Sequence, residues 1–313
     1  MTDRLFSTPL STIRAFLMAA EFKNFTRAAE ALDLSQPNLS RVLASLETEL
    51  GAQLFLRSRR GVVLTDAGAH FQAAATNILR QMDGLVAEVR SRELSPGGRV
   101  AVGLPVVMTE FVTRPLAIWF AKEFPNAQLS VHEGVSDELE FAYSLGRLDI
   151  ALLISTETRA RNLETTPLAN EQVFLHASSK AKLSGSPVSW RALAELPLIL
   201  PRSSNYLRRK IEEACRRYGL RLNVISEVNT PSTMLSLVEA GAGYSVLPGC
   251  ASYMQRARGT ISVAPVRGFK IVWSMVHNHN TPQPTLVSAV EEKLRELIYA
   301  QANRKLWNPI ERK

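Results

Sequence analysis

Cysteine, long apolar runs and targeting segments are scarce or missing in this sequence of 313 residues. Only Cys215 and Cys250 occur, too few for a disulfide framework and typical of a reducing compartment, and we interpret both as small buried apolar side chains. No stretch approaches the ~18 consecutive apolar residues of a membrane span. Charges and a proline interrupt residues 1–14, where a signal peptide needs an apolar core. The sequence therefore predicts a cytoplasmic protein without a membrane association.

Catalytic and metal-binding motifs are also missing. The sequence contains no Gly-x-Ser-x-Gly, Walker loop or Cys-His arrangement. His277 and His279 have no acidic residue or cysteine close in sequence, which favours a surface loop over a metal pair. The Gly-Ala-Gly at 241–243 follows a predicted helix, so it indicates a helix stop rather than a dinucleotide site. We therefore predict no enzyme, no metal and no cofactor.

Net charge gives only a weak indication of the partner. The formal net charge is +8 and the pI about 9.7, which favours a polyanionic partner. Residues 1–95 hold 11 basic against 10 acidic residues, whereas residues 96–313 hold 26 against 19. The excess therefore lies mostly outside the N-terminal segment. The length corresponds to two or three domains of ~150 residues.

The first 51 residues predict three helices. The first ends near Phe22, and a second, short helix follows Thr26. Ser35 is expected to cap the third, with Pro37 in its opening turn and a Gly51 stop. Its buried stripe is expected to comprise Leu39, Val42, Leu43, Leu46 and Leu50. Two short helices joined by a tight turn are typical of a helix-turn-helix, whose second helix can enter the major groove.

Polar residues on this third helix and arginines after it point to nucleic acid. Gln or Asn can pair with adenine, and Arg with guanine or phosphate. The outward residues are Gln36, Asn38, Ser40 and Arg41. A solvated helix face explains these residues equally well. The next segment predicts strand 54–56, a basic turn and strand 62–64, and the turn contains Arg57, Arg59, Arg60 and Gly61. A hairpin in this position favours a phosphate-binding wing over a soluble loop.

The segment 25–68 resembles, without a gap, the N-terminal module of the LysR-type transcriptional regulators. Shared features include the alanine pair 28–29, Ser-Gln-Pro at 35–37, Leu-Gly at 50–51, Leu-Phe at 54–55 and Leu-Thr at 64–65. The resemblance implies a mainly α winged helix-turn-helix over residues 1–65 that binds double-stranded DNA. Asn38 stands where the family often has a small residue, so operator preference does not carry over from relatives. The predicted DNA-binding residues are Thr26, Arg27, Ser35, Gln36, Pro37, Asn38, Ser40, Arg41, Arg57, Arg59 and Arg60.

A long helix is predicted from Asp66 to about Arg92, capped by Thr65 or Asp66. Apolar residues recur along it in steps of four and three, the spacing of a coiled-coil seam. They are Phe71, Ala75, Ile78, Met82, Leu85 and Val89. Packing of this stripe against its own domain is the alternative, because the run is shorter than three heptads. The resemblance implies a linker and dimerisation helix (66–93) and a homodimer or homotetramer, and Leu-Ser-Pro-Gly-Gly at 94–98 predicts a hinge.

The remaining two thirds alternate strand and helix patterns. Residues 99–155 read as βαβαβ, which predicts a largely parallel sheet. A second such set follows, and a closing helix is expected through Leu286, Val290, Leu294 and Ile298. We predict an effector-binding domain (99–303) with lobe 1 at 99–162 and 271–303 and lobe 2 at 163–270, and a basic tail at 304–313. The lobes would be connected near 160–166 and 266–270, with a cleft between them.

This region resembles the α/β periplasmic-binding-protein-like (type II) effector domain of the same family. Residues 196–248 are most similar to the branch that contains the nitrogen-assimilation-control regulators. The resemblance implies a small-molecule effector. Helix N-termini at the strand ends favour a small anion or carboxylate there. The candidate effector-binding residues are Pro105, Met108, Thr109, Ser155, Arg202, Ser203, Ser204, Asn205, Thr230 and Ser232.

Several alternatives stay open for this cleft. Any single Ser or Thr among the candidates is more simply an N-cap. Many relatives have Ser or Thr directly after the first strand, whereas this chain has Val106 and Val107, so either Thr109 substitutes or the ligand is less polar. A cleft without a ligand is a further alternative. The basic residues between Arg208 and Arg221 are interpreted as a solvated helix face.

A ligand-gated, sequence-specific DNA-binding transcription regulator accounts for every segment. The alternative is a helix-turn-helix fused to an enzymatic or ligand-independent α/β domain. A solute-binding protein would need export and no helix-turn-helix. RNA polymerase is a further candidate partner of a regulator.

Overall fold

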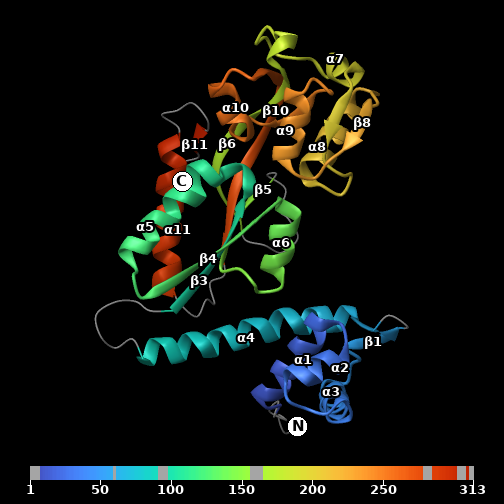
Figure 1. The fold of residues 1–313 in the computed structure, drawn as a ribbon, viewed down its shortest axis with the longest axis vertical. Coiled ribbons are helices and arrows are strands. Elements are labelled where there is room, and N and C mark those ends of the chain that lie inside the picture. The colour runs from blue at the N-terminus through green and yellow to red at the C-terminus, as the bar shows by residue number, and fades with distance from the viewer. Residues whose placement is uncertain are drawn as a thin grey trace.

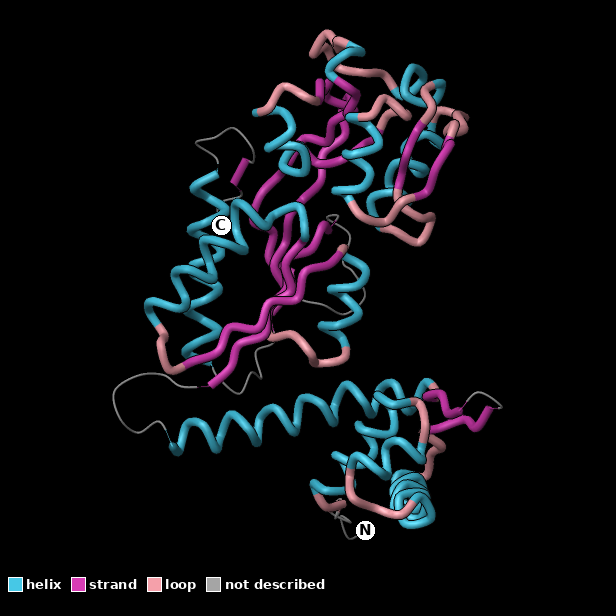
Figure 2. Tube along the Cα trace, in the orientation of Figure 1, coloured by secondary structure: helices cyan, strands magenta, loops and turns pink. Residues whose placement is uncertain are grey.

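The computed structural model describes residues 8–58, 61–90, 98–155, 165–277, 284–301 and 308–309. A small helical domain at the N-terminus is joined by the long helix α4 to a larger α/β domain (Figure 1). Figure 2 shows the strands of the larger domain running through its centre with helices on the outside. Among the described helices, none combines the length and apolar character of a membrane span.

The N-terminal domain has the predicted order of three helices, a hairpin and a long helix. Its elements are α1 (Leu10–Phe22), α2 (Phe25–Ala31), α3 (Gln36–Leu50), β1 (Phe55–Ser58), β2 (Gly61–Leu64) and α4 (Asp66–Arg90). The predicted end of α1 at Phe22 and the glycine stop of α3 at Gly51 are confirmed. The strands β1 and β2 are antiparallel, as a wing requires.

The start of α3 corrects one prediction. Ser35 precedes the helix with extended backbone, but its hydroxyl makes no cap hydrogen bond. Pro37 lacks an N–H, and the N–H of Asn38 donates to the backbone oxygen of Ser35 at 3.0 Å. The two donors that a capping side chain would satisfy are therefore absent or already paired. The sequence also missed Asn24, which caps α2 by accepting the N–H groups of Thr26 and Arg27 at 2.9 and 3.2 Å.

The hairpin is held onto the helices by aromatic and backbone contacts. Phe55 is buried, and its ring lies 5.1 Å from that of Phe16 and 5.3 Å from that of Phe25. Gly68 allows α4 to pack against the start of the wing, because a Cβ there would overlap the carbonyl oxygen of Leu54. The Thr65 hydroxyl accepts the Gly68 N–H at 2.9 Å, so the predicted cap of α4 is confirmed.

Lobe 1 of the larger domain is built on a mixed sheet rather than the largely parallel one predicted. β3 (Gly98–Pro105) is parallel to both β4 (Ala127–Gly134) and β5 (Ile150–Ser155). β10 (Ile261–His277) then pairs with β5 in the antiparallel sense, because the chain returns to this lobe from lobe 2. The helices of lobe 1 are α5 (Arg114–Glu123), α6 (Ser136–Ser144) and α11 (Pro284–Ala300).

Lobe 2 contains the second set of strands and helices. Its elements are α7 (Trp190–Glu195), β7 (Leu198–Leu200), α8 (Tyr206–Arg217), β8 (Val224–Glu227), α9 (Pro231–Glu239), β9 (Ser245–Pro248) and α10 (Tyr253–Ala257). β7 and β8 are parallel, and β9 is antiparallel to β6 (Thr165–Ser178). The short strand β11 (Asn308–Pro309), within the segment predicted as a basic tail, pairs with β6.

The two lobes are joined by the long strands β6 and β10, which overlap the two connections predicted near 160–166 and 266–270. β6 and β10 pair with each other from Thr165 to Ser178, with register shifts in β10 between Pro265 and Lys270 and between Trp273 and Ser274. Residues 165–170 of β6 pair with the part of β10 that also pairs with β5, so they extend the sheet of lobe 1. The prediction of a crossing at 162–163 was therefore too early, because cross-strand pairing continues past it. One apolar core extends through both lobes.

Candidate DNA-binding surface and ligand cleft

The predicted recognition helix has one buried and one exposed face. Leu39, Leu43 and Leu46 are buried in the core of the N-terminal domain. On the opposite face the predicted contact residues Ser35, Pro37, Asn38 and Arg41 are exposed. Gln36 and Ser40 are half-buried, and the Gln36 amide donates to the Ser40 hydroxyl at 3.0 Å. The polar residues therefore lie on the face of α3 that is open to a DNA groove.

Thr26 and Arg27 are also exposed, at the start of α2. The Arg27 guanidinium lies 5.3 Å from the centre of the Phe22 ring, a cation–π distance. This contact positions one basic side chain at the helix-turn-helix surface.

The wing is fixed in place by the C-terminal half of α3. Glu47 accepts the backbone N–H groups of Leu54 and Phe55 at 2.7 and 3.0 Å. The N–H of Val62 donates to the carbonyl of Lys23 at 3.0 Å. Arg57 lies on β1 opposite Val62, whereas its side chain and the whole of Arg59 and Arg60 lie outside the described residues. Figure 1 shows the hairpin projecting away from the helices.

The predicted seam on α4 divides into two parts. The Phe71 ring lies edge-on to Phe16 at 4.8 Å, so Phe71 belongs to the core of its own domain and its assignment to the seam is wrong. Ala75 is buried in the single chain as well. Ile78 and Met82 are 41% and 40% exposed, one helical turn apart, and can face another chain. The side chains of Leu85 and Val89 lie outside the described residues.

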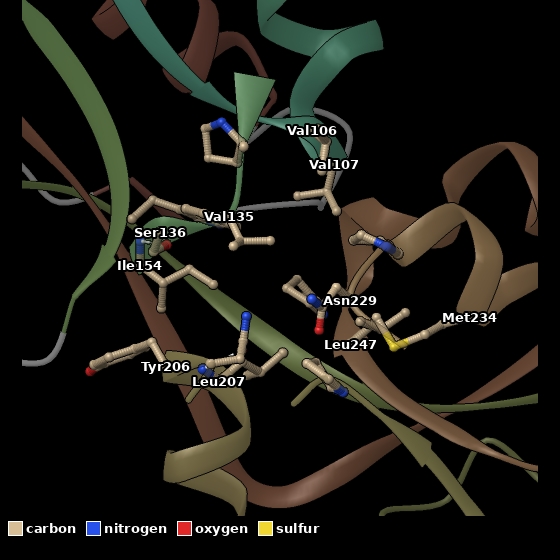
Figure 3. A pocket seen from close by; sticks show the side chains of 17 residues that line it. Val106, Val107, Val135, Ser136, Ile154, Tyr206, Leu207, Asn229, Met234 and Leu247 are labelled. Carbon is tan, nitrogen blue, oxygen red and sulfur yellow. Dashed lines mark hydrogen bonds between the residues drawn. The ribbon is translucent and has the colours of Figure 1, made fainter. Parts of the chain in front are cut away.

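A cleft of about 510 Å³ lies between the two lobes, at the carboxyl ends of strands from both. Figure 3 shows Val106 and Val107 from the end of β3 facing Met234 and Leu247 of lobe 2, with Val135 and Ile154 alongside. Its floor includes Trp273 of β10. The lining is predominantly apolar, with Ser136, Asn205, Tyr206 and Asn229 as its polar members.

The predicted effector residues fall into four groups. Pro105 and Asn205 line this cleft. Thr109, Thr230 and Ser232 line a neighbouring cavity of about 730 Å³. Met108 is fully buried in the core, and the exposed Arg202, Ser203 and Ser204 line neither cavity, so their assignment to the cleft is wrong. The side chain of Ser155 lies outside the described residues.

The residues that were wrongly assigned to the cleft are turned away from it by the local backbone. Residues 106–108 form a turn of 3-10 helix directly after β3, which directs Met108 into the core. Asn205 caps α8 by accepting the N–H groups of Leu207 and Arg208, and the loop residues before it turn toward solvent. The sequence indicated part of the apolar wall, because Val106 and Val107 follow the first strand, but it did not indicate Val135, Ile154, Met234 or Leu247.

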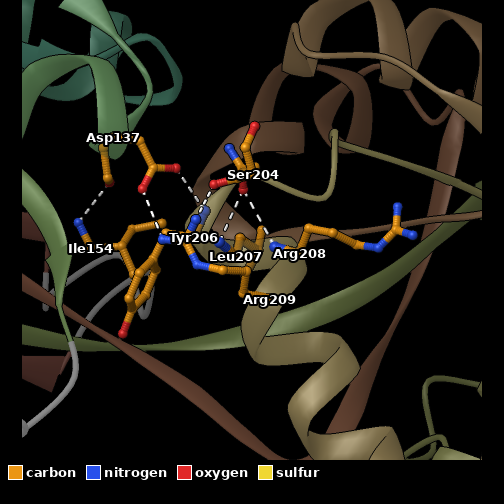
Figure 4. A network of polar contacts seen from close by, with 9 residues as sticks. Asp137, Ile154, Ser204, Tyr206, Leu207, Arg208 and Arg209 are labelled. Atoms are coloured by element: carbon orange, nitrogen blue, oxygen red, sulfur yellow. Dashed lines mark hydrogen bonds and ion pairs between the residues drawn. The ribbon is translucent and has the colours of Figure 1, made fainter.

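Polar groups at the cleft are bonded to one another. The Thr109 hydroxyl lies 2.8 Å from a Glu133 oxygen and 2.9 Å from the carbonyl of Val106. The Ser136 hydroxyl accepts the N–H of Ile154 at 2.9 Å. Asp137 of α6 accepts the Tyr206 N–H at 2.8 Å and a guanidinium N–H of Arg209 at 2.9 Å, which links lobe 1 to lobe 2 (Figure 4).

Below the cleft, a buried carboxylate and a buried imidazole join the strands that connect the lobes. Glu171 accepts the indole N–H of Trp273 at 2.5 Å and the N–H of Cys250 at 2.6 Å. His176 lies 2.8 Å from the Ser252 hydroxyl and 3.0 Å from the carbonyl of Phe174. Burial lowers the pKa of His176 to about 4, so the ring is neutral at pH 7.

Other predicted features have simple structural outcomes. Cys215 and Cys250 are both buried, and burial raises the pKa of the Cys215 thiol. His277 lies at the end of β10 with Nδ1 3.2 Å from Glu291, whereas His279 lies outside the described residues. Within the part of the chain that is described, no three His, Cys, Asp or Glu side chains form a metal-binding group.

The basic face of α8 is largely solvated, as predicted, and Arg208 is the exception. Arg208 is 7% exposed, and its guanidinium donates to Glu212 at 2.6 Å and to the carbonyl of Pro201 at 3.0 Å. The exposed Arg217 and the half-buried Lys210 pair with Glu213 and lower the pKa of that carboxyl. Arg208 thus ties α8 to the loop before it, whereas Lys210 and Arg217 pair with an acidic residue of the same helix.

Two family models match almost the whole chain. Residues 10–69 match the bacterial regulatory helix-turn-helix protein of the lysR family, and residues 94–298 match the LysR substrate binding domain. The nitrogen assimilation regulatory protein nac of Klebsiella aerogenes is 30% identical over 244 residues, covering 78% of this chain and 79% of the relative. The regulator YbhD of Escherichia coli is 32% identical over 249 residues, covering 77% and 76%.

Solved structures show the same fold. A full-length OxyR variant from Pseudomonas aeruginosa has a TM-score of 0.71 at 23% identity, covering 98% of this chain and all of that one. Full-length CbnR complexed with its target DNA has a TM-score of 0.58 at 23% identity, covering 92% and 99%. The resemblance to the nitrogen-assimilation-control branch is confirmed by the nac relatives. The chain therefore belongs to the LysR family and is a DNA-binding transcription regulator with an effector-binding domain.

Proposed function

We propose that the exposed polar side chains on the first turns of α3 read base edges, while the β1–β2 wing contacts the flanking phosphates. The observation that supports this proposal is the division of α3 into a leucine face in the core and an exposed face bearing Asn38 and Arg41. Asn and Arg are the side chains that pair in two places with adenine and guanine. Arg41 would then contact a base inside the major groove, and the wing arginines would contact phosphates beside it.

The test begins with selection of duplexes that the protein binds from a random-sequence library. Affinity for the selected duplex is then measured by mobility shift at fixed salt. We expect Arg41→Ala to weaken binding by about 1–3 kcal/mol and Arg59→Ala by less, because a phosphate contact is worth less than a bidentate base contact. Arg258→Ala removes an equal charge from an exposed site in lobe 2 and is the control. Unchanged affinity in both test variants would rule out this surface.

Dimerisation through α4 is part of the same proposal. One winged helix covers one half-site, and two that are paired cover a pseudo-palindrome. Ile78 and Met82 are the exposed apolar residues of α4 that support a seam. Replacement of both by Asp should dissociate the dimer or tetramer in sedimentation experiments, whereas Ile225→Asp, at an exposed apolar site in lobe 2, should leave the assembly intact. An unchanged assembly in the double variant would place the interface elsewhere.

We further propose that a small-molecule effector binds the cleft between the lobes and changes the angle between them. The linker helix would transmit this change to the paired DNA-binding domains and alter the bending of the DNA. The cleft has a mainly apolar lining with a few polar groups, a composition typical of small-molecule sites, and this supports the proposal. The carboxylate character of the effector, the contact with RNA polymerase and the cytoplasmic location stay predictions from the sequence.

A further inference from the structure

The start of α8 is where the cleft would bind a negatively charged ligand. A helix N-terminus favours an anion because its first N–H groups lack intrahelical acceptors. α8 has 12 residues and begins at Tyr206, on the wall of the cleft. Arg209 adds a guanidinium one turn into the helix. These groups together would suit a carboxylate, which is the ligand class that the sequence predicts.

The chain already supplies acceptors for these donors. Asp137 accepts the Tyr206 N–H at 2.8 Å, and Asn205 Oδ1 accepts the N–H groups of Leu207 and Arg208 at 2.9 and 3.3 Å. The N–H of Arg209 donates to the backbone oxygen of Asn205 at 3.0 Å. The first four N–H groups of α8 are therefore all paired within the described residues.

The Arg209 guanidinium is engaged in the same way. One terminal nitrogen donates to Asp137 at 2.9 Å, and the other donates to the carbonyl of Ser204. Figure 4 shows Asp137 reaching from α6 to both the start of α8 and Arg209. A carboxylate of lobe 1 thus occupies the position that an anionic ligand would need in lobe 2.

Further carboxylates lie near the cleft on the side of lobe 1, at the end of β4 and in the first turn of α6. Glu138 and Asp137 both lie in the first turn of α6, where Glu138 accepts the Val135 N–H at 3.3 Å. Glu133 follows along β4 and binds the Thr109 hydroxyl. At the start of α9, Pro231 lines the cleft and has no N–H. An anion that approaches from the side of lobe 1 would therefore come close to Glu133, Asp137 and Glu138.

We propose that this cleft selects an uncharged, largely apolar ligand, because Asp137 takes the place of the ligand carboxylate and ties the lobes together. This inference rests on the proposed effector function of the cleft. Val106, Val107, Val135 and Ile154 then form the surface that contacts the ligand, and Asp137 joins lobe 1 to the N–H of Tyr206, which lines the same cleft. Val106 and Val107, directly after β3, give the cleft wall the apolar character that such a ligand needs.

The test compares ligands that differ only in charge. Benzamide and benzoate, and hexanamide and hexanoate, are titrated into the full-length protein and followed by ligand-detected NMR and calorimetry. We expect the wild-type protein to bind each amide at least about tenfold more tightly than the matching acid. Asp137→Ala should raise the affinity for the acids by about tenfold, because the Tyr206 N–H and Arg209 lose their acceptor.

Two further variants separate the anion site from simple loss of charge. Asp137→Asn removes the charge but keeps an oxygen for the Tyr206 N–H, so the acids should gain less than in Asp137→Ala. Glu138→Gln removes a neighbouring charge from the same helix without freeing any donor of α8. Its acid affinity should stay close to that of the wild type. Circular dichroism of each variant establishes that it is folded.

The proposal is overturned if the wild-type protein prefers the acids, or if Asp137→Ala gains no more affinity for them than Glu138→Gln. Absence of acid binding by folded Asp137→Ala also overturns it, because a freed helix N-terminus with an arginine should take a carboxylate. Failure of the effector function looks different. In that case a bound amide leaves the affinity for the selected DNA unchanged, while the charge selectivity of the cleft persists.

Discussion

The two binding regions of this protein treat their polar groups in opposite ways. On α3, the proposed recognition helix, Asn38 and Arg41 point outward from a leucine core and are exposed. In the cleft, Ser136 and Asn205 are bonded to backbone N–H groups, and Asp137 pairs with a backbone N–H and an arginine of the other lobe. One surface is thus prepared to receive charge from a partner. In the cleft, the polar groups are bonded within the protein, and the apolar walls are left to contact a ligand.

The same contrast appears in two carboxylates that hold strands in place. Glu47 in the DNA-binding domain and Glu171 beneath the cleft each accept two N–H groups. Glu47 is half-buried, whereas Glu171 is 1% exposed. Water can replace the first carboxylate but has no access to the second.

Replacing each of these carboxylates by leucine tests this contrast, and Glu171→Leu should give the largest loss of stability. Glu171→Leu leaves two buried donors without an acceptor and should lower the free energy of unfolding by about 3–5 kcal/mol. Glu47→Leu should lower it by about 1 kcal/mol, because water can hydrate its donors. All four tryptophans lie beyond residue 96, so their fluorescence in urea reports the larger domain, and far-UV circular dichroism adds the helical one. Equal losses in the two variants would show that burial does not decide the outcome.

Low pH should destabilise the larger domain through protonation of His176. The pKa of this ring is lowered to about 4 in the folded protein, against about 6.5 when unfolded, because the ring is buried. The unfolded chain therefore binds the proton first. Stability contributed by the neutral ring is complete above pH 6.5 and falls by about 3 kcal/mol as the pH drops toward 4.

The measurement is urea unfolding by tryptophan fluorescence at several values between pH 7 and pH 4.5. His176→Gln can keep hydrogen bonds to Ser252 and Phe174 but cannot gain a proton, so its pH dependence should be flatter than that of the wild type. Parallel curves for the two proteins would mean that His176 is not the group that titrates.

Most of the N-terminal domain could be predicted because its signals are local. The ends of α1 and α3 follow from apolar spacing and from Gly51, which sit within one or two turns of the structure they determine. The errors there have local causes too. Pro37 removed the donor that Ser35 was expected to cap, and Phe71 met Phe16 of its own domain instead of a second chain.

The cleft was less predictable because its walls come from residues far apart in sequence. Individual elements were predictable, such as the closing helix through Leu286 and Ile298, which lies where α11 is found. Which side chains meet is determined by the pairing of β6 with β10 and by the contact of Asp137 with Tyr206, which is 69 residues away. Sequence spacing carries no information on such a contact, so Met108 and Arg202 were assigned to the cleft and Asp137 was not.

The smallest effect comes from removing one helix cap in each region. Asn24 caps α2 and Asn205 caps α8, each by accepting two N–H groups, and Ala at either position should lower the free energy of unfolding by about 1 kcal/mol. Tryptophan fluorescence should detect the loss for Asn205→Ala, whereas Asn24→Ala should change only the helical signal. The two variants also differ in function. Asn24→Ala loosens the helix that carries Arg27 and should weaken binding to the selected DNA. Asn205→Ala frees N–H groups at the cleft and should improve benzoate binding while DNA affinity without ligand is unchanged. A loss of DNA affinity equal in both variants would mean that the two regions do not act as the separate surfaces inferred from their polar groups.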